Sequence, residues 1–225
     1  MRTEEVAALV PAAGSGSRLG RGPKAFVTLA GRTLLEWAVA ALRPFVSEVV
    51  VAVPAAEVEA ARALVPDARV MHGAATRQAT VALLAAATTR RWVVLHDAAR
   101  PFLDADTVRA VLAALPQARA LSVAMPVADS LVDARDGSSV DRTPLWAVQT
   151  PQAFERRLLL EAHAAAEAAG VVATDDAALV RRLQVPVVLV AGGAHLMKVT
   201  TPGDLRLAEA YARGLRPASA AAEAP

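Results

Sequence analysis

Residues 6–24 read VAALVPAAGSGSRLGRGPK, and this stretch decides the fold class. Its apolar run, residues 6–10, ends at Pro11 and predicts a strand that is buried on both faces. The loop that follows is built of small residues and contains four of the chain's 12 glycines. A buried strand with a glycine-rich loop at its carboxyl end is typical of ligand-binding α/β folds.

Three familiar motifs do not fit this loop. A Walker loop requires Gly-Lys-Ser/Thr, but Pro23 precedes Lys24 and Ala25 follows it. A dinucleotide-binding loop needs a small residue where Leu19 stands, and a nucleophile elbow needs a glycine two residues to either side of a serine. What remains is a loop whose backbone amides, with Arg18 and Lys24, can bind a polyphosphate. The alternative is a solvated turn with incidental basic residues.

The composition excludes several classes of protein. The 225 residues are 55% hydrophobic and 20% charged, which favours a globular core over disorder. There is no cysteine, and no apolar run approaches the ~20 residues that span a bilayer, so we expect a cytoplasmic protein that does not enter a membrane. The net charge is only +2 and the arginines are dispersed, which argues against nucleic-acid binding.

The use of lysine is more specific. Of the 24 basic residues only two are lysines, Lys24 and Lys198. Because every other basic residue of the chain is an arginine, the two lysines indicate positions that need a compact ammonium rather than a planar guanidinium. Chance is the competing explanation.

Strands and helices alternate along the chain, which predicts an α/β fold with a doubly wound parallel sheet. We expect one domain, 1–217, and a disordered tail, 218–225. After the first strand, strands are expected at 48–53, 69–71, 92–95, 121–125, 186–190 and 196–199. Helices are expected at 33–43, 55–64, 77–88, 104–115, 154–169, 175–183 and 201–213. The loops 12–24, 73–80 and 97–101 would then meet at the carboxyl edge of the sheet, where ligands bind.

Residues 126–150 break this alternation. They have no helical period and contain Asp136-Gly137, a dipeptide typical of hairpins. We therefore predict a β-arm that projects from the sheet. Such an arm would be poorly buried in a monomer, so we expect it to pack on a second copy of the chain, with Trp146 as a packing or dimer-contact residue.

Motifs spread over residues 6–213 carry a resemblance to a known family. They are Val10-Pro-Ala-Ala-Gly-Ser-Gly-Ser-Arg-Leu, Pro23-Lys24, Leu95-His-Asp-Ala-Ala-Arg-Pro, Asp141-Arg142 with Gln149-Thr-Pro-Gln, and Lys198-Val-Thr. The chain resembles the sugar-nucleotide-type nucleotidyltransferases and, among them, the 2-C-methyl-D-erythritol 4-phosphate cytidylyltransferases. The resemblance implies a mixed, mainly parallel sheet and a homodimer joined through the β-arm. It implies transfer of CMP from CTP to the methylerythritol phosphate of the non-mevalonate isoprenoid pathway, giving 4-diphosphocytidyl-2-C-methyl-D-erythritol and pyrophosphate, with Mg²⁺ as cofactor.

The same resemblance implies roles for individual residues. Arg18 and Lys24 match the residues that stabilise the transition state, and Arg142 and Lys198 match the pair that positions the sugar phosphate. Asp97 is also the candidate protein ligand of an Mg²⁺ that the CTP phosphates mainly hold. The implied substrate and nucleotide contacts are Ala12, Ala13, Gly14, Gly16, Gly73, Arg77, Thr80, Asp97, Ala98, Arg100, Ser130, Thr150 and Thr174.

The chain departs from the family pattern at three of its positions. In the base-recognition loop, 73–80, Ala74 replaces the usual second glycine and Thr80 replaces a serine but keeps a hydroxyl. Ala74 is expected to restrict the backbone beside the cytosine. Ser130 stands where the family commonly has threonine.

Two other functions remain as alternatives. A ribitol-5-phosphate cytidylyltransferase shares much of the pattern, although Pro11-Ala-Ala-Gly and Asp97-Ala-Ala-Arg favour the methylerythritol substrate. A catalytically inactive nucleotide-binding homologue would keep the fold without the reaction. Single residues also have plainer interpretations: Asp97 could cap the turn after its strand, and Asp175-Asp176 could mark the start of a helix.

Overall fold

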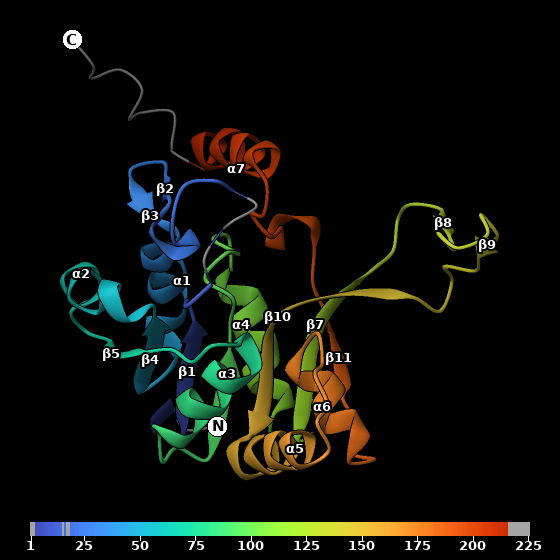
Figure 1. The fold of residues 1–225 in the computed structure, drawn as a ribbon, viewed down its shortest axis with the longest axis horizontal. Helices are drawn as coiled ribbons and strands as arrows, with labels where there is room; N and C mark the ends of the chain where they lie inside the picture. The colour runs from blue at the N-terminus through green and yellow to red at the C-terminus, as the bar shows by residue number, and fades with distance from the viewer. Residues whose placement is uncertain (1–2, 15, 17–18, 216–225) are drawn as a thin grey trace.

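The computed structural model describes residues 3–14, 16 and 19–215, and its centre is a seven-stranded sheet (Figure 1). The strand order is β11-β7-β10-β6-β1-β4-β5. Strand β10 runs antiparallel to both of its neighbours, whereas the other neighbouring pairs are parallel. The strands are β1 (Val6–Pro11), β4 (Glu48–Val53), β5 (Arg69–His72), β6 (Trp92–Leu95), β7 (Ala120–Pro126), β10 (Trp146–Glu155) and β11 (Val188–Ala191). The mixed, mainly parallel sheet that the resemblance implied is confirmed.

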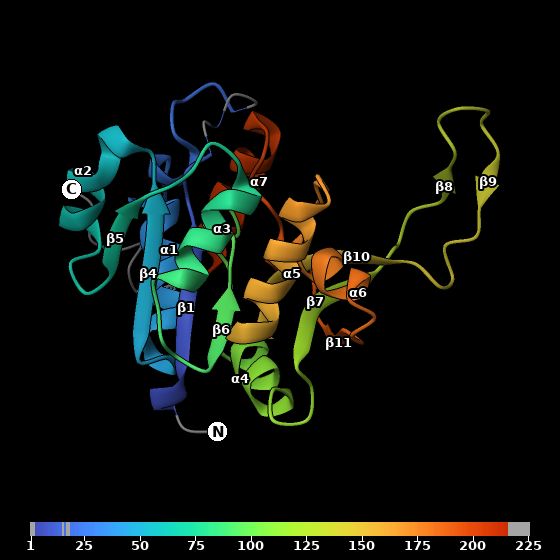
Figure 2. The same cartoon turned by 60° about the horizontal axis from the view of Figure 1, so that its bottom comes forward.

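Helices cover both faces of the sheet (Figure 2). One face packs against α1 (Leu34–Leu42), α2 (Val58–Leu64) and α4 (Ala105–Ala114), and the other against α3 (Arg77–Ala86), α5 (Arg156–Ala168) and α6 (Asp176–Arg182). The strands are apolar on both faces for this reason: in β4, Val49 and Val51 face the first helix layer, whereas Val50 and Ala52 face the second. No helix in the described part of the chain is long and apolar enough to cross a bilayer.

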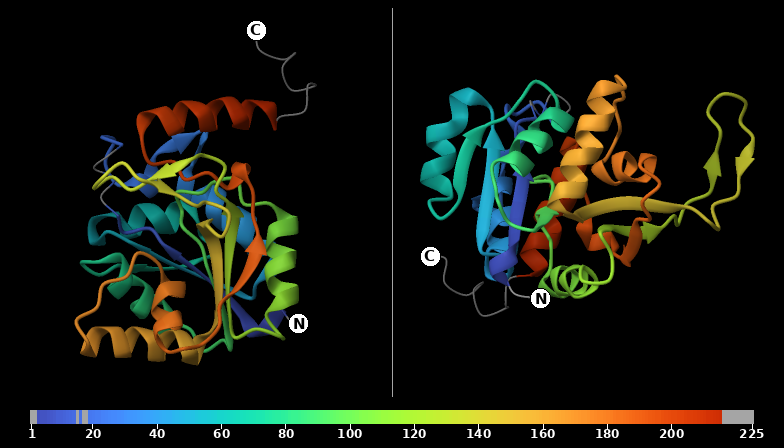
Figure 3. Two further views of the ribbon diagram at one scale, coloured as in Figure 1. Left: turned by 90° about the vertical axis from the view of Figure 1, so that its right-hand side faces the viewer. Right: turned by 90° about the horizontal axis from the view of Figure 1, so that it is seen from below.

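A third apolar cluster joins the last helix to the loop region after β1. Helix α7 (Pro202–Gly214) lies across the hairpin formed by β2 (Thr28–Leu29) and β3 (Arg32–Thr33) (Figure 3). A capping box between Thr201 and Asp204 begins α7, which fixes where the preceding segment, 197–200, ends. Short 3₁₀ turns complete the fold: η1 (Thr3–Glu5), η2 (Lys24–Phe26), η3 (Arg43–Phe45), η4 (Ala55–Glu57) and η5 (Ala194–Leu196).

Strand β10 was not predicted. We expected residues 126–150 to be arm and a helix to begin at 154, yet residues 146–155 form a strand in the middle of the sheet. Its buried centre is polar, with Gln149, Thr150 and Gln152, and it contains Pro151. The proline and the run of polar side chains disfavour a strand in the middle of a sheet. The register shifts between Val148 and Gln152, and this irregularity accommodates the proline within the sheet.

The expected strand at 196–199 was wrong. Turn η5 ends at Leu196, and the following residues run over the loop after β6 without joining the sheet. Leu196 is buried in the core of the first helix layer, whereas Val199 is buried in the cluster beneath α7. The sequence of a short run with apolar residues does not show whether those side chains enter one core, as in a strand, or two different cores.

The projecting arm is present in the structure. Its tip is the two-stranded hairpin of β8 (Leu131–Val132) and β9 (Ser139–Val140), which lies well away from the seven-stranded sheet (Figure 1). The predicted Asp136-Gly137 turn joins the two strands, and Gly137 has a φ of 75°, which glycine adopts without strain.

Candidate active site

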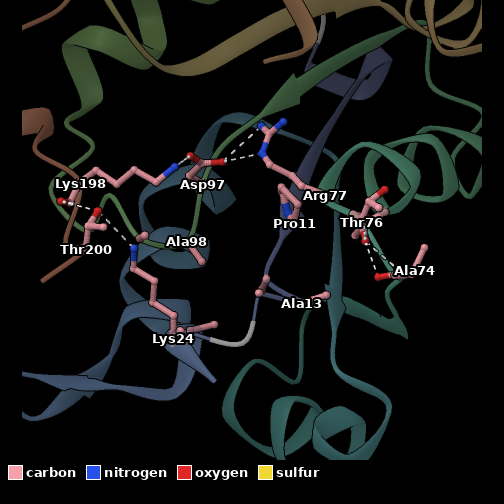
Figure 4. A pocket seen from close by; sticks show the side chains of 17 residues that line it. Pro11, Ala13, Lys24, Ala74, Thr76, Arg77, Asp97, Ala98, Lys198 and Thr200 are labelled. Atoms are coloured by element: carbon pink, nitrogen blue, oxygen red, sulfur yellow. Dashed lines mark hydrogen bonds and ion pairs between the residues drawn. The ribbon is translucent and has the colours of Figure 1, made fainter. Parts of the chain in front are cut away.

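A pocket of about 510 Å³ lies where β1, β5 and β6 end (Figure 4). It is lined by residues 11–14 and 16 at and beyond the end of β1, by Lys24 and Ala25 in η2, by residues 74–77 with Thr80 around the start of α3, by residues 97–99 after β6, and by Lys198 and Thr200 before α7. Its volume falls within the ~300–1,000 Å³ typical of small-molecule sites. The described parts of the loops 12–24, 73–80 and 97–101 therefore do meet at one edge of the sheet.

The two lysines of the chain lie on the same wall of this pocket. The Lys24 ammonium Nζ donates to the Thr200 hydroxyl at 3.5 Å, and that hydroxyl donates to the Lys198 carbonyl at 3.3 Å. Figure 4 shows both side chains directed into the pocket, one from η2 and the other from the segment before α7. Two ammonium groups that are distant in sequence thus face a single cavity.

Asp97 is the carboxylate at the centre of the site. Its Oδ2 accepts a hydrogen bond from Lys198 Nζ at 2.6 Å, and its Oδ1 accepts from the Arg77 guanidinium at 3.3 and 3.4 Å. Burial alone would raise the pKa of this carboxyl, but the charges of Arg77 and Lys198 outweigh burial and hold the pKa well below its ordinary value. Asp97 is therefore ionised at any physiological pH and links the two cations.

A buried network fixes Asp97 from below. The Thr150 hydroxyl accepts from the Asp97 backbone N–H at 3.2 Å and so directs its own proton to His96 Nδ1 at 3.0 Å. That assignment leaves His96 Nε2 protonated, to donate to the Arg100 carbonyl at 2.9 Å. Burial lowers the pKa of His96 to about 4, so its ring is neutral at pH 7. The network connects β10 to the end of β6.

The neutral state of His96 predicts a pH-dependent stability. Between pH 6.5 and about 4 the unfolded chain binds a proton at this histidine and the folded chain does not, so the free energy of unfolding falls as pH is lowered through that window. The expected loss is about 2 kcal/mol between pH 7 and pH 5. Urea unfolding at the two pH values measures it. The loss should shrink by that amount in His96→Gln and persist in His72→Gln, which alters an exposed histidine; an unchanged loss in His96→Gln would contradict the assignment.

The segment that carries Lys198 is tied down by side chains from three elements. The Gln149 amide donates to the Gly193 carbonyl at 2.9 Å, and Arg100 donates to the Leu196 carbonyl at 2.5 Å. His195 Nε2 lies 2.5 Å from Asp104 Oδ2, the carboxylate that caps α4. Lys198 is thereby placed over the pocket although its backbone is irregular.

The loop after β5 packs tightly against the loop after β1. A side chain at Gly73 would collide with the Ala13 Cβ, so glycine is required where the two loops cross. The Thr80 hydroxyl accepts from the Ala74 N–H at 3.0 Å and donates to the Thr76 carbonyl at 2.8 Å, which holds the loop against the first turn of α3. The non-glycine residues of positive φ among those described are Ala30 and Gln184, so Ala74 adopts a conformation open to any residue.

Comparison with known proteins identifies the chain. The family model described as 2-C-methyl-D-erythritol 4-phosphate cytidylyltransferase matches residues 6–214. The chain belongs to this family.

Individual cytidylyltransferases are similar over nearly their whole length. The 2-C-methyl-D-erythritol 4-phosphate cytidylyltransferase of Deinococcus radiodurans is 58% identical over 207 residues, which are 91% of this chain and 88% of that protein. That of Thermus thermophilus is 48% identical over 212 residues, covering 93% and 98%. A crystal structure of the cytidylyltransferase from Thermus thermophilus superposes with a TM-score of 0.83 at 45% identity, covering 93% of this chain and 99% of that one.

The structure brings together most residues that the resemblance to the cytidylyltransferases singled out. They come from five separate stretches of the chain, and the pocket described above joins them. Those that line it are Ala12, Ala13, Gly14, Gly16, Lys24, Arg77, Thr80, Asp97, Ala98 and Lys198.

Other predicted contacts lie elsewhere. Thr150 is buried beneath Asp97, and the Arg100 guanidinium donates to the carbonyls of Leu196 and Val148, so both support the wall of the pocket. Gly73 lies behind the lining, and Thr174 is exposed in the bend before α6. Ser130 and Arg142 are exposed on the arm, and Arg18 lies outside the described residues.

Sequence reasoning missed Thr76, Thr200 and Asp176. Thr76 caps α3 and lines the pocket, and Thr200 contacts Lys24. Thr200 belongs to the Lys198-Val-Thr motif, which was the available signal. Asp175-Asp176 does mark the start of a helix, as interpreted, but the buried carboxylate of Asp176 also pairs with Arg77 and His163, which no spacing in the sequence could show.

The pocket lining does not supply enough acidic ligands to hold a metal ion by itself. In the described part of the chain, no group of three or more His, Cys, Asp or Glu side chains could hold a metal ion. Asp97 is the carboxylate of the pocket lining, and its two oxygens already face Lys198 and Arg77. This donor set fits an Mg²⁺ that arrives on triphosphate oxygens and takes at most one protein ligand, because Mg²⁺ is commonly held by substrate phosphates with one or two carboxylates.

Proposed function

We propose that the protein transfers CMP from CTP to 2-C-methyl-D-erythritol 4-phosphate and releases pyrophosphate. The observation that carries this function is the meeting of Lys24 and Lys198 with Arg77 around one pocket at the carboxyl edge of the sheet. Membership of the cytidylyltransferase family supports the choice of CTP and of the methylerythritol phosphate.

The reaction joins two polyanions. A phosphate oxygen of the sugar phosphate forms a bond to the α-phosphorus of CTP, and the bond from that phosphorus to the β-phosphate oxygen breaks, releasing pyrophosphate. The attacking phosphate monoester is already ionised at neutral pH, so no general base is needed. Catalysis then consists of overcoming charge repulsion and holding the reactants in line.

The cations of the pocket suit that task. Lys24 would neutralise the triphosphate and the charge that develops at the α-phosphorus, and Lys198 would hold the two phosphates near each other. The first turn of α3 borders the same cavity, and the helix dipole gives that end of the helix a partial positive charge. Fixed positive charge thus surrounds the space before substrate enters, which lowers the cost of reorganisation during the reaction.

The base of CTP is proposed to lie against the loop 73–80. The Ala13 side chain packs directly against the backbone at Gly73, so this loop and residues 12–14 form adjoining parts of one pocket wall. The Thr80 hydroxyl forms its hydrogen bonds with Ala74 and Thr76 of the loop itself. We therefore propose that Thr80 stabilises the wall and does not contact the base.

Mg²⁺ is the proposed cofactor, with Asp97 as the candidate protein ligand. When bound on the triphosphate, it would neutralise phosphate oxygens and ease the departure of pyrophosphate. Asp97 also contacts Lys198 and Arg77 at the edge of the cavity, and these two contacts form without a metal ion.

The arm supports a proposed homodimer. Apolar side chains of Val132, Val140, Leu145, Trp146 and Val148 are exposed along it, and exposed apolar surface of this kind marks an interaction site. Arg142 is exposed on the same arm, which projects away from the seven-stranded sheet (Figure 1). We propose that the arm packs on a second copy and brings Arg142 to the partner's sugar-phosphate site.

A cytoplasmic location stays a prediction from the sequence.

A direct turnover assay tests the function. Pyrophosphate release with CTP and Mg²⁺ should be fast with the methylerythritol phosphate and at least about 100-fold slower with ribitol 5-phosphate, because a site that positions one polyol discriminates against another by several hydrogen bonds. The opposite preference would establish the ribitol enzyme. No release with either substrate, despite CTP binding, would indicate an inactive homologue.

A further inference from the structure

The Arg77 guanidinium is shared between the pocket and a buried carboxylate outside it. Its NH1 donates to Asp176 Oδ2 at 2.7 Å, whereas its Nε and NH2 approach Asp97 Oδ1 at 3.4 and 3.3 Å. The bond to Asp176 is the short, charge-assisted one, and the contacts to Asp97 are long. Asp176, which is not part of the pocket lining, therefore dominates the placement of Arg77.

The side chain of Asp176 is itself fixed in the position from which it binds Arg77. Its side chain is only 1% exposed, and its other oxygen lies 3.0 Å from Nε2 of His163 on α5, a histidine that is itself buried. A buried carboxylate is stable only when its oxygens are paired in this way. The N-terminus of α6 does not need it, because Asp175 already supplies the cap by accepting from the Ala178 N–H. The carboxylate of Asp176 thus faces Arg77 rather than the end of its own helix.

Removal of this carboxylate would change the pocket through Arg77. Asp97 would then be the carboxylate left to the guanidinium, which could move onto it as a bidentate pair. Arg77 would leave the wall formed by the start of α3, and it would compete with Lys198 for Asp97, which the lysine now holds at 2.6 Å. The present arrangement, in contrast, keeps Lys198 and Arg77 on different oxygens of Asp97.

We infer that Asp176, supported by His163, is a positioning residue that sets the nucleotide end of the pocket by holding Arg77. It acts through Arg77 and contacts no substrate. The inference rests on the proposed function in one respect, that CTP occupies the pocket beside Arg77. It adds a residue pair on α5 and α6, two helices that do not line the pocket.

A double-mutant cycle tests the inference. In the full-length protein we expect Asp176→Asn to raise the KM for CTP about tenfold, with a smaller change in kcat and in the KM for the methylerythritol phosphate. In an Arg77→Gln background the same substitution should change the KM for CTP less than about twofold, because its target is gone. Asp106→Asn is the matched control: it removes an acid from the first turn of α4, but that acid is exposed and pairs with Arg109. It should leave both constants unchanged.

Further results decide the remaining cases. Equal effects of Asp176→Asn with and without Arg77, or a lower unfolding temperature with unchanged KM for CTP, would overturn the inference by showing a purely structural role. If the asparagine variant does not fold, Asp176→Glu keeps the buried charge but displaces the carboxylate, and it must show the same dependence on Arg77. Calorimetric binding of CTP repeats the cycle without turnover, so a wild-type protein that binds CTP without reacting would contradict the proposed function alone.

Discussion

Lys24→Ala should lower kcat at least about 100-fold, the loss expected when one fixed donor to a developing charge is removed. Lys24 projects from η2 into the pocket and reaches Thr200, so its ammonium is fixed before substrate binds. Negative charge grows around the α-phosphorus and on the departing pyrophosphate as the reaction proceeds. A fixed cation stabilises that state more than it stabilises bound CTP, so the loss appears in kcat. Pyrophosphate release at saturating CTP and sugar phosphate measures it.

Two variants of nearby residues control this result. Lys24→Arg keeps the charge but replaces a compact ammonium with a planar guanidinium, and it should restore only part of the rate. Arg21→Ala removes an exposed basic residue of the same loop that does not line the pocket, and it should retain the wild-type rate. Unchanged turnover in Lys24→Ala would remove this lysine from the chemistry.

Arg142→Ala should raise the KM for the methylerythritol phosphate at least about 30-fold, because a guanidinium binds phosphate through two parallel charge-assisted hydrogen bonds and the loss of such a partner costs several kcal/mol. The KM for CTP should change far less. Arg135→Ala is the control on the same arm, since Arg135 is exposed and pairs with Asp133 at the tip. A defect confined to the KM for CTP would contradict the role given to Arg142.

A mixing experiment separates the arm from the pocket. If the arm of one subunit completes the pocket of the other, Lys24→Ala chains supply an intact arm and Arg142→Ala chains supply an intact pocket. Random pairing of the two then gives about a quarter of the wild-type sites, so two nearly inactive preparations should gain activity on mixing. No gain after subunit exchange would place Arg142 in its own subunit's site or outside the reaction.

Local patterns in the sequence were sufficient for much of the fold. The strands expected at 48–53 and 92–95 have those bounds in β4 and β6. Residues 49–53 and 92–95 are continuous apolar runs, and polar residues or proline flank each run. Thr33 and Asp104 begin their helices through side-chain caps, which short-range chemistry dictates. The arm was found for the opposite reason, the loss of any period across residues 126–150.

Local sequence patterns did not reveal which distant segments of the chain pack or pair with each other. Strand β10 carries buried glutamines and a proline, and it becomes a central strand because β6 and β7 pair with it on both sides and the register shift admits the proline. The segment 196–199 was expected to be a strand, yet Leu196 and Val199 enter two different cores and leave it outside the sheet.

The sequence by itself determined the chemistry that is present: a glycine loop after the first strand, two isolated lysines, and an acid at the end of β6. It determined these because such features depend on residue type and on neighbours within a few positions. Only the tertiary structure decided which groups meet. Lys24 and Lys198 are 174 positions apart in sequence yet face one cavity, and Asp176 controls Arg77 from another helix. Such contacts follow from the packing of whole elements, and burial then makes each charge depend on partners that no local pattern specifies.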